Sequence, residues 1–205
     1  MQQIIIVIII SYLIGSIPTA YIFGRLIKKV DIRKFGSGNV GATNALRLLG
    51  KGWGITVLII DILKGCLPVI FLGNFMQDQN LRIAIGLACI CGHNWTIFLK
   101  FKGGKGVATT FGVLIALSLT IPGLKIVLGL TILVWFITFI ISRMISLSSI
   151  LSALSFPVLT IIFRQSLIII SISILLSLFL IYRHKANILR IMQGKESRLS
   201  FNKQK

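Results

Sequence analysis

Acidic side chains are scarce in this sequence, and so are the residue types that usually bind metals. The 205 residues include 4 Asp and Glu, 2 His and 3 Cys, against 22 Lys and Arg. So few carboxylates leave little for metal binding, and the cysteines lie in apolar stretches with neither zinc spacing nor a disulfide framework. No Cys or Ser has a His or a carboxylate convincingly placed beside it in the sequence. We therefore expect no metal, no cofactor and a chemistry that works mostly by positioning anions.

Long hydrophobic runs, by contrast, cover most of the chain. Hydrophobic residues make up 56% of it, and the mean hydropathy of +0.97 lies well above that of soluble domains. A membrane-spanning helix needs about 20 mostly apolar residues. The sequence therefore predicts an all-α polytopic integral membrane protein, a single domain over 1–205 with seven transmembrane helices. The predicted spans are 4–24, 53–73, 81–99, 107–122, 124–142, 148–164 and 166–182.

Positive charge is concentrated in alternate loops between these spans. Residues 25–51 carry seven Lys and Arg, residues 100–105 carry three, the connection after the fifth span carries one and the tail from 183 carries seven. These 18 residues face three in the opposite loops, which predicts an external N-terminus and a cytoplasmic C-terminus. The net charge of +18 then reflects topology beside anionic membrane lipids, and no nucleic acid partner is expected.

A glycine-rich segment follows the first span. Residues 35–44, "FGSGNVGATN", contain Gly36, Gly38 and Gly41 in the spacing of a dinucleotide-binding fingerprint, with Asp61 20 positions after the last of them. That fingerprint requires a strand before the glycines, whereas here a membrane span precedes them and Asp61 lies inside the next span. The segment "KGGKGVAT" likewise departs from the Walker pattern, so neither NAD nor ATP is indicated.

Both segments keep the features that bind other phosphates. Glycines let backbone N–H groups approach an anion, and helix N-termini favour negative charge. Residues 35–44, which we call the glycine loop, add the side-chain donors Ser37, Asn39, Thr43 and Asn44, and Arg47 follows at helical spacing. In residues 103–106, the glycine–lysine turn, Lys105 and the backbone N–H groups from Gly103 and Gly104 onward are suited to a second anion. A polar turn and a basic topology loop are the simpler alternatives.

Five further polar residues stand out because they lie in or near apolar spans. Asp61 and Lys64 are three residues apart, on one face of the second span, where they form either a structural ion pair or part of a substrate site. His93, near the end of the third span, is either a packing residue or faces a substrate. His184 and Asn187 are also three residues apart, at the cytoplasmic end of the last span, and could line the same pocket.

Five segments together resemble the bacterial acyl-phosphate:glycerol-3-phosphate acyltransferases, the PlsY family. They are "SYLIGSIPTAY", "GSGNVGATNALRLLGKGWG", "DILKG", "GHNWTIFLKFKGGKGVATTFG" and "RHKANILRIMQGKE", in the family's order and over essentially the whole chain. One departure is Thr96, where family members usually have proline. This substitution puts the local kink in question.

The resemblance implies a seven-helix enzyme of the bacterial cytoplasmic membrane with its active site on the cytoplasmic side. It implies transfer of a fatty acyl group from acyl phosphate to the 1-position hydroxyl of glycerol 3-phosphate, giving lysophosphatidic acid and phosphate. A soluble enzyme that makes acyl phosphate would be the upstream partner. Ser37, Arg47, Lys105, His184 and Asn187 match glycerol 3-phosphate positions of the family, and residues 38–44 match its acyl-phosphate hole. The substrate-binding set implied in this way consists of Gly38, Asn39, Gly41, Ala42, Thr43 and Asn44, with Gly103, Gly104 and His93.

A transporter of a phosphorylated anion is the rival interpretation. Transporters commonly contain inverted repeats and helices broken near the membrane midplane. This sequence has neither pattern, and its polar motifs cluster on one predicted side. A membrane scaffold would leave the donor-rich loops unexplained.

Overall fold

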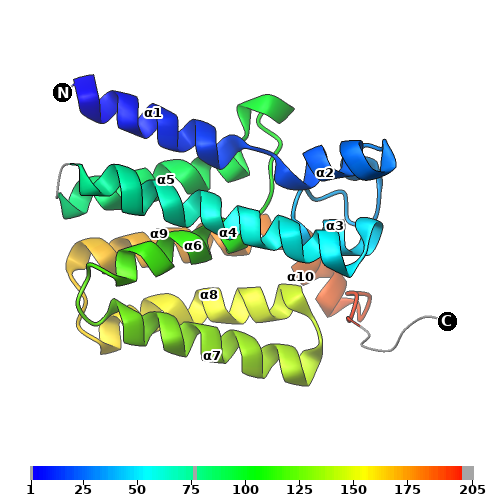
Figure 1. Ribbon diagram of the computed structural model, residues 1–205. Coiled ribbons are helices and arrows are strands. Elements are labelled where there is room, and N and C mark those ends of the chain that lie inside the picture. Colours follow the sequence, from blue (N-terminus) through cyan, green and yellow to red (C-terminus); the bar gives the residue numbers. More distant parts are fainter. Residues whose placement is uncertain (1, 76–77, 200–205) are drawn as a thin grey trace. The chain divides into compact units, whose positions relative to one another are not determined.

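The computed structural model describes residues 2–75 and 78–199, and these residues form helices joined by loops (Figure 1). The all-α prediction is therefore confirmed for the described part of the chain. The helices before the midpoint are α1 (Gln2–Ser16), α2 (Thr19–Lys28), η1 (Ile32–Lys34), α3 (Ala42–Leu49), α4 (Lys51–Asn74) and α5 (Gln79–Asn94). They are followed by η2 (Ile97–Leu99), α6 (Val107–Ser118), α7 (Leu124–Ser142), α8 (Ile145–Ile162), α9 (Leu167–Arg183) and α10 (Lys185–Met192), where η denotes a short 3-10 helix.

Each predicted span contains a helix, and the predicted span 124–142 coincides with α7, but the other helices differ in length from the prediction. Five continuous or nearly continuous helical segments of the described chain are long and apolar enough to cross a membrane: Gln2–Lys28, Lys51–Asn74, Gln79–Leu99, Leu124–Ser142 and Ile145–Ile162. A sixth is obtained if α9 and α10, bent by 60° at His184, count as one span. The structure therefore supports five or six spans by length and composition.

The remaining predicted span, 107–122, contains only α6, a helix of 12 residues. At 1.5 Å per residue it is about 18 Å long, well short of the roughly 30 Å hydrocarbon core of a bilayer. The chain turns after Ser118, where Pro122 and Gly123 precede α7 and Gly123 takes a φ of +77°. The apolar sequence continues through this turn, which is why hydropathy placed the end of the helix too late.

The chain divides into two compact units, Met1–Thr120 and Ile121–Lys205. In the first unit α1 packs on α5 and α4 packs on α6 (Figure 1). Glycines make these contacts close: a Cβ on Gly15 would overlap the Cys89 backbone, and a Cβ on Gly112 would overlap the Ile62 carbonyl oxygen. Small residues allow such backbone approach between helices in a membrane.

In the second unit α8 packs between α7 and α9. Thr160 on α8 and Ser173 on α9 are both buried, and their hydroxyl oxygens lie 3.0 Å apart in a hydrogen bond. The indole nitrogen of Trp135 on α7 donates to Ser149 on α8 at 3.4 Å. Hydroxyl groups thus link neighbouring helices whose remaining surface is apolar.

Candidate active site

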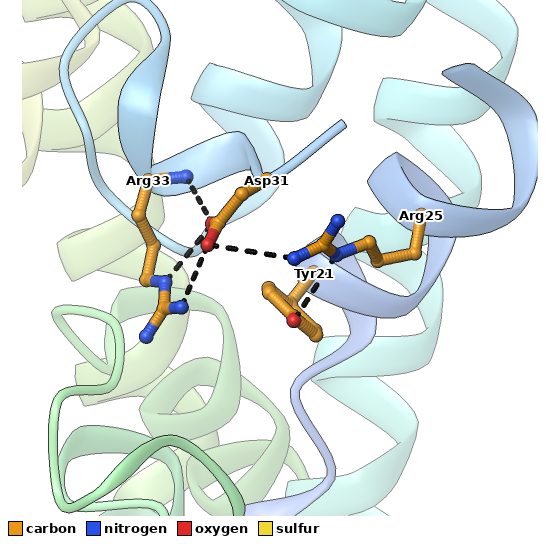
Figure 2. Close-up of polar contacts among 4 residues, drawn as sticks. All are labelled: Tyr21, Arg25, Asp31 and Arg33. Carbon is orange, nitrogen blue, oxygen red and sulfur yellow. Dashed lines mark hydrogen bonds and ion pairs between the residues drawn. The ribbon is translucent and has the colours of Figure 1, made fainter. Parts of the chain in front are cut away.

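An ionic cluster fixes the chain just before the glycine loop. Figure 2 shows the Asp31 carboxylate between the guanidinium groups of Arg25 and Arg33. Arg33 binds it through two nitrogens, at 2.9 and 2.7 Å, while Arg25 donates to the Tyr21 hydroxyl at 3.1 Å. The hydrogen bond from Arg33 lowers the pKa of Asp31 to about 2, against the opposing effect of desolvation. The end of α2 and the start of η1 are therefore held together where the chain enters the glycine loop.

Two glycines of the loop require their lack of a side chain. Gly36 and Gly38 have φ values of +55° and +68°, in the left-handed region that other residues rarely adopt. A Cβ on Gly36 would also overlap the side-chain oxygen of Asn44. Gly41 differs, because its φ of −151° is ordinary extended backbone. The glycines at 36 and 38 thus shape the loop, whereas Gly41 serves as the N-cap of α3.

Asn44 orders the loop from within. Its side chain is buried, and its amide nitrogen lies 3.1, 3.0 and 3.0 Å from the carbonyl oxygens of Ile32, Phe35 and Asn39. Its amide oxygen accepts the backbone N–H of Ser37 at 3.1 Å. The sequence suggested Asn44 as a donor to a substrate, but the structure directs its side chain to the loop's own backbone.

The start of α3 places backbone N–H groups at the end of the glycine loop. The helix begins at Ala42, and the N–H groups of Asn44 and Ala45 donate to the Gly41 carbonyl oxygen at 3.0 and 3.1 Å. The N–H groups of Ala42 and Thr43 precede the first bond of the helix and are therefore the donors directed out of its N-terminus. Thr43 and Arg47 lie one turn apart on α3, and Arg47 and Ser37 are exposed. Backbone donors thus lie at the N-terminus of a short helix, an arrangement that favours an anion, while the cation Arg47 lies in the last turn of the same helix.

The glycine–lysine turn is anchored on the end of α5. The N–H groups of Gly103 and Gly104 donate to the carbonyl oxygens of Asn94 and His93, at 3.1 and 3.0 Å. The expectation that these two N–H groups bind an anion is therefore wrong, because the end of α5 already accepts them. A Cβ on Gly104 would overlap the Nε2 atom of His93, so the imidazole ring packs directly on this glycine. Lys105 is half-buried immediately after these bonds. Of the two roles left open for His93, the structure favours packing against the turn.

The glycine loop and the segment before the glycine–lysine turn share one hydrophobic core. Val40 in the loop and Ala45 on α3 belong to a cluster of buried side chains that also contains Leu99 of η2. Leu99 lies four residues before Gly103, so tertiary packing brings the two motifs into one region of the first unit.

Asp61 and Lys64 form a buried ion pair, one of the two alternatives that the sequence left open. The Lys64 Nζ atom lies 2.7 Å from Asp61 Oδ1, and the two side chains are 5% and 2% exposed. Lys64 also donates to the Ile17 carbonyl oxygen at 2.8 Å. Pro18 breaks the predicted 4–24 helix at this point, because it has no N–H to donate.

Thr96 preserves the backbone that a proline would impose. Its φ of −65° and ψ of 125° are values that proline favours, so the departure from the family pattern leaves the local bend in place. The Thr96 hydroxyl donates to the Ser16 carbonyl oxygen, beside the break between α1 and α2.

In the second unit, His184 and Asn187 are both buried where α9 passes into α10. His184 Nδ1 lies 2.8 Å from the Leu180 carbonyl oxygen, and Asn187 donates to Glu196 Oε1 at 2.7 Å. Glu196 also accepts bonds of 2.7 Å from Ser146 and Arg190. The sequence analysis gave Glu196 no role. Its position in a basic tail could have indicated one, because carboxylates are rare in this chain.

The electrostatics of Glu196 follow from these contacts. Burial raises the pKa of its carboxyl group, but the hydrogen bonds from Ser146, Asn187 and Arg190 outweigh burial and leave the pKa below its ordinary value. A carboxylate that accepts several hydrogen bonds stays ionised. Glu196 therefore fixes the Asn187 side chain. Its bonds also hold the segment that follows α10 against α8 and α10.

Apolar helices of spanning length, with cationic glycine-supported loops at their ends, define a helical multi-span membrane protein suited to binding phosphorylated ligands. The family comparison makes this class specific. The chain belongs to the glycerol-3-phosphate acyltransferase family, whose model matches residues 5–194. The resemblance to the PlsY family is thereby confirmed.

Relatives named glycerol-3-phosphate acyltransferase match nearly the full chain. The one from Macrococcus caseolyticus is 45% identical over 204 residues, covering 98% of this chain and 100% of the relative. The one from Desulforudis audaxviator is 42% identical over 200 residues, covering 98% of both.

Two solved structures are also similar over most of their length. The crystal structure of PlsY (YgiH), an integral membrane glycerol 3-phosphate acyltransferase, in its glycerol 3-phosphate form gives a TM-score of 0.86 at 38% identity, covering 96% of both chains. Its lysophosphatidic acid form gives a TM-score of 0.82 at 36% identity, covering 96% of this chain and 95% of that one. At these identities the similarity extends beyond the fold to the family.

Proposed function

We propose that this protein transfers a fatty acyl group from acyl phosphate to the 1-position hydroxyl of glycerol 3-phosphate, giving lysophosphatidic acid and inorganic phosphate. The observation that carries the proposal is the similarity, at 38% identity over 96% of the chain, to a PlsY structure in its glycerol 3-phosphate form. The lysophosphatidic acid form of the same enzyme corresponds to the product side of this reaction.

The chemistry suits a chain that positions anions. In acyl phosphate the carbonyl carbon carries a phosphate leaving group, so the acceptor hydroxyl can attack it directly. The new ester C–O bond forms, the bond from the carbonyl carbon to the phosphate oxygen breaks, and the hydroxyl proton is transferred to a base. A phosphate oxygen of a substrate can serve as that base. Proximity and stabilisation of the developing charge then provide most of the acceleration.

The two substrates are assigned to different groups of residues. Ser37, Arg47 and Lys105 would bind glycerol 3-phosphate, the role that the family resemblance also gives to His184 and Asn187. The backbone and side chains of residues 38–44 would hold the acyl-phosphate group. Asn44, whose side chain bonds to the loop, would act by keeping that backbone in place.

The topology proposed from the charge distribution has seven spans, an external N-terminus and a cytoplasmic C-terminus in the bacterial inner membrane. The short helix α6 would fill the position of one span without crossing the whole hydrocarbon core. A soluble enzyme that makes acyl phosphate would supply the donor from the cytoplasm. A reporter fused to the C-terminus should be active only in the cytoplasm, and activity outside would refute this orientation.

Purified protein in detergent or vesicles tests the reaction. Mixed with synthetic acyl phosphate and glycerol 3-phosphate, it should release phosphate and form lysophosphatidic acid in equal amounts. Glycerol, which lacks the phosphate, should be a poor acceptor, and acyl-CoA should be a poor donor. If vesicles containing the protein take up glycerol 3-phosphate but form no ester, the transporter interpretation replaces this proposal.

A further inference from the structure

A buried polar cluster in the first unit lies beside the residues assigned to substrates. It consists of Thr19, Asp61, Lys64 and His93. Asp61 Oδ1 lies 2.7 Å from Lys64 Nζ and accepts the Thr19 hydroxyl at 3.0 Å. Charged groups are costly inside a membrane protein and are retained where they are paired or functional. The pairing of Asp61 with Lys64 accounts for their burial, and the remaining question is what the pair holds in place.

His93 connects this pair to the glycine–lysine turn. Its Nδ1 atom lies 3.8 Å from Asp61 Oδ1, on one side of the ring. On the other side Nε2 packs against Gly104, at the position that a Cβ of residue 104 would occupy. The carbonyl oxygen of His93 accepts the N–H of Gly104 at 3.0 Å. The same residue thus faces the buried carboxylate and supports the turn through both its ring and its backbone.

The chain after Lys105 is anchored on the same helix as the ion pair. Gly106 takes a φ of +82° as the N-cap of α6, which begins at Val107 and packs on α4. Gly65, next to Lys64, is so close to α6 that a Cβ would overlap the Thr109 carbonyl oxygen. Lys105 therefore lies between a glycine held by His93 and a helix packed beside Asp61 and Lys64.

We infer that Asp61 and His93 are positioning residues for glycerol 3-phosphate: the Asp61–Lys64 pair orients the His93 imidazole, and the imidazole sets the position of Lys105 through Gly104. This inference rests on the proposed function through the role given to Lys105. Loss of one hydrogen bond to a charged group costs about 10- to 150-fold in affinity. Because the turn is assigned to glycerol 3-phosphate rather than to the acyl donor, the effect should appear in the KM for glycerol 3-phosphate.

Two variants disturb the cluster in different ways. His93→Phe keeps a ring of similar size without the nitrogen facing Asp61 and introduces no buried charge. The double variant Asp61→Asn with Lys64→Met removes both charges together, so neither is left unpaired. Thr160→Val is the matched control, because it removes a buried hydroxyl contact in the second unit. Lys105→Ala serves as the reference for the proposed function.

Initial rates are measured against each substrate, together with the melting temperature of each purified variant. His93→Phe and the double variant should raise the KM for glycerol 3-phosphate about 10- to 100-fold, because a displaced Lys105 loses most of its hydrogen bond to the substrate. Their KM for acyl phosphate and their kcat should stay within about threefold of wild type, and Thr160→Val should leave all three constants unchanged.

Three outcomes overturn the inference. Folded variants with an unchanged KM for glycerol 3-phosphate would mean that the cluster serves packing only. Equal increases in both KM values would mean that it does not act through the turn. Loss of folding in both cluster variants, with Thr160→Val still folded, would make the cluster a stability element. If Lys105→Ala itself leaves the KM for glycerol 3-phosphate unchanged, the residue assignment of the proposed function fails instead.

Discussion

The substitution Asn44→Asp should open the glycine loop, although it barely changes the shape of the side chain. The Asn44 amide nitrogen lies within 3.1 Å of three carbonyl oxygens, of Ile32, Phe35 and Asn39. A carboxylate offers no proton to any of them and places negative charge beside them. The variant therefore loses the bonds that close the loop and gains a repulsion.

The size of the effect follows from the number of donated protons. One NH₂ group has two hydrogens, so three acceptors share about two full hydrogen bonds. At about 0.5–1.5 kcal/mol each, their loss destabilises the closed loop by about 1–3 kcal/mol, before any cost of the buried charge. Since 1.4 kcal/mol is tenfold, the open fraction should rise about 5- to 150-fold.

Limited trypsin digestion measures this opening. The exposed residues Arg33 and Lys34 provide cleavage sites beside the loop, and cleavage rates follow the open population when opening is fast relative to cleavage. Cleavage after these residues should accelerate by the same factor in Asn44→Asp. Asn39→Asp adds the same charge to a residue whose backbone accepts the Asn44 bond, so it controls for charge alone. Cleavage of Asn44→Asp within twofold of wild type, or equal acceleration in both variants, would refute the reasoning.

Three further predictions use matched pairs or a pH series. Gly112→Ala should lower the melting temperature, because its Cβ would overlap the α4 backbone and overpacking costs about 1–3 kcal/mol. Gly129→Ala on α7 meets open space and should be neutral or stabilising. Equal melting temperatures of the two variants would contradict this reasoning. The folded protein lowers the pKa of Glu196, so its contribution to stability is present above the unfolded pKa of about 4.3 and is lost as pH falls through the folded pKa. Glu196→Gln should therefore lose less stability than wild type when the pH is lowered. An equal fall of melting temperature with pH in both proteins would exclude this role. Arg47→Ala should raise the KM for glycerol 3-phosphate about 10- to 150-fold, from about 1.5–3 kcal/mol for a hydrogen bond to a charged group, and equal effects of Arg183→Ala would contradict the assignment.

Hydropathy located the helices but not their interruptions. The span predicted at 124–142 coincides with α7, Leu124–Ser142, because Gly123 and Arg143 end the helix in left-handed conformations at both sides. The predicted 148–164 span lies within three residues of α8, Ile145–Ile162. The 4–24 span, however, is broken at Pro18, where the apolar residues around the proline hide the break from an average over the window.

In the candidate site, too, the sequence pattern located the motif but did not predict its contacts. The glycine spacing indicated an unusual loop, but it did not distinguish the backbone conformations of Gly36, Gly38 and Gly41. The structure requires positive φ only at the first two, because Gly41 is extended. Residue type likewise made Asn44 a candidate substrate donor, whereas burial directs its amide to the loop backbone.

The sequence by itself determined the class of membrane protein, the approximate helices, the two anion-suited motifs and the family. These features depend on local composition and on residue order, which a single chain displays directly. Only the tertiary structure decided that Asp61 accepts from Thr19, that Lys64 donates to the Ile17 carbonyl oxygen, and that Ser146 donates to Glu196. Such partners depend on which helix faces pack together, because a buried polar group bonds to whatever donor or acceptor the neighbouring helix presents.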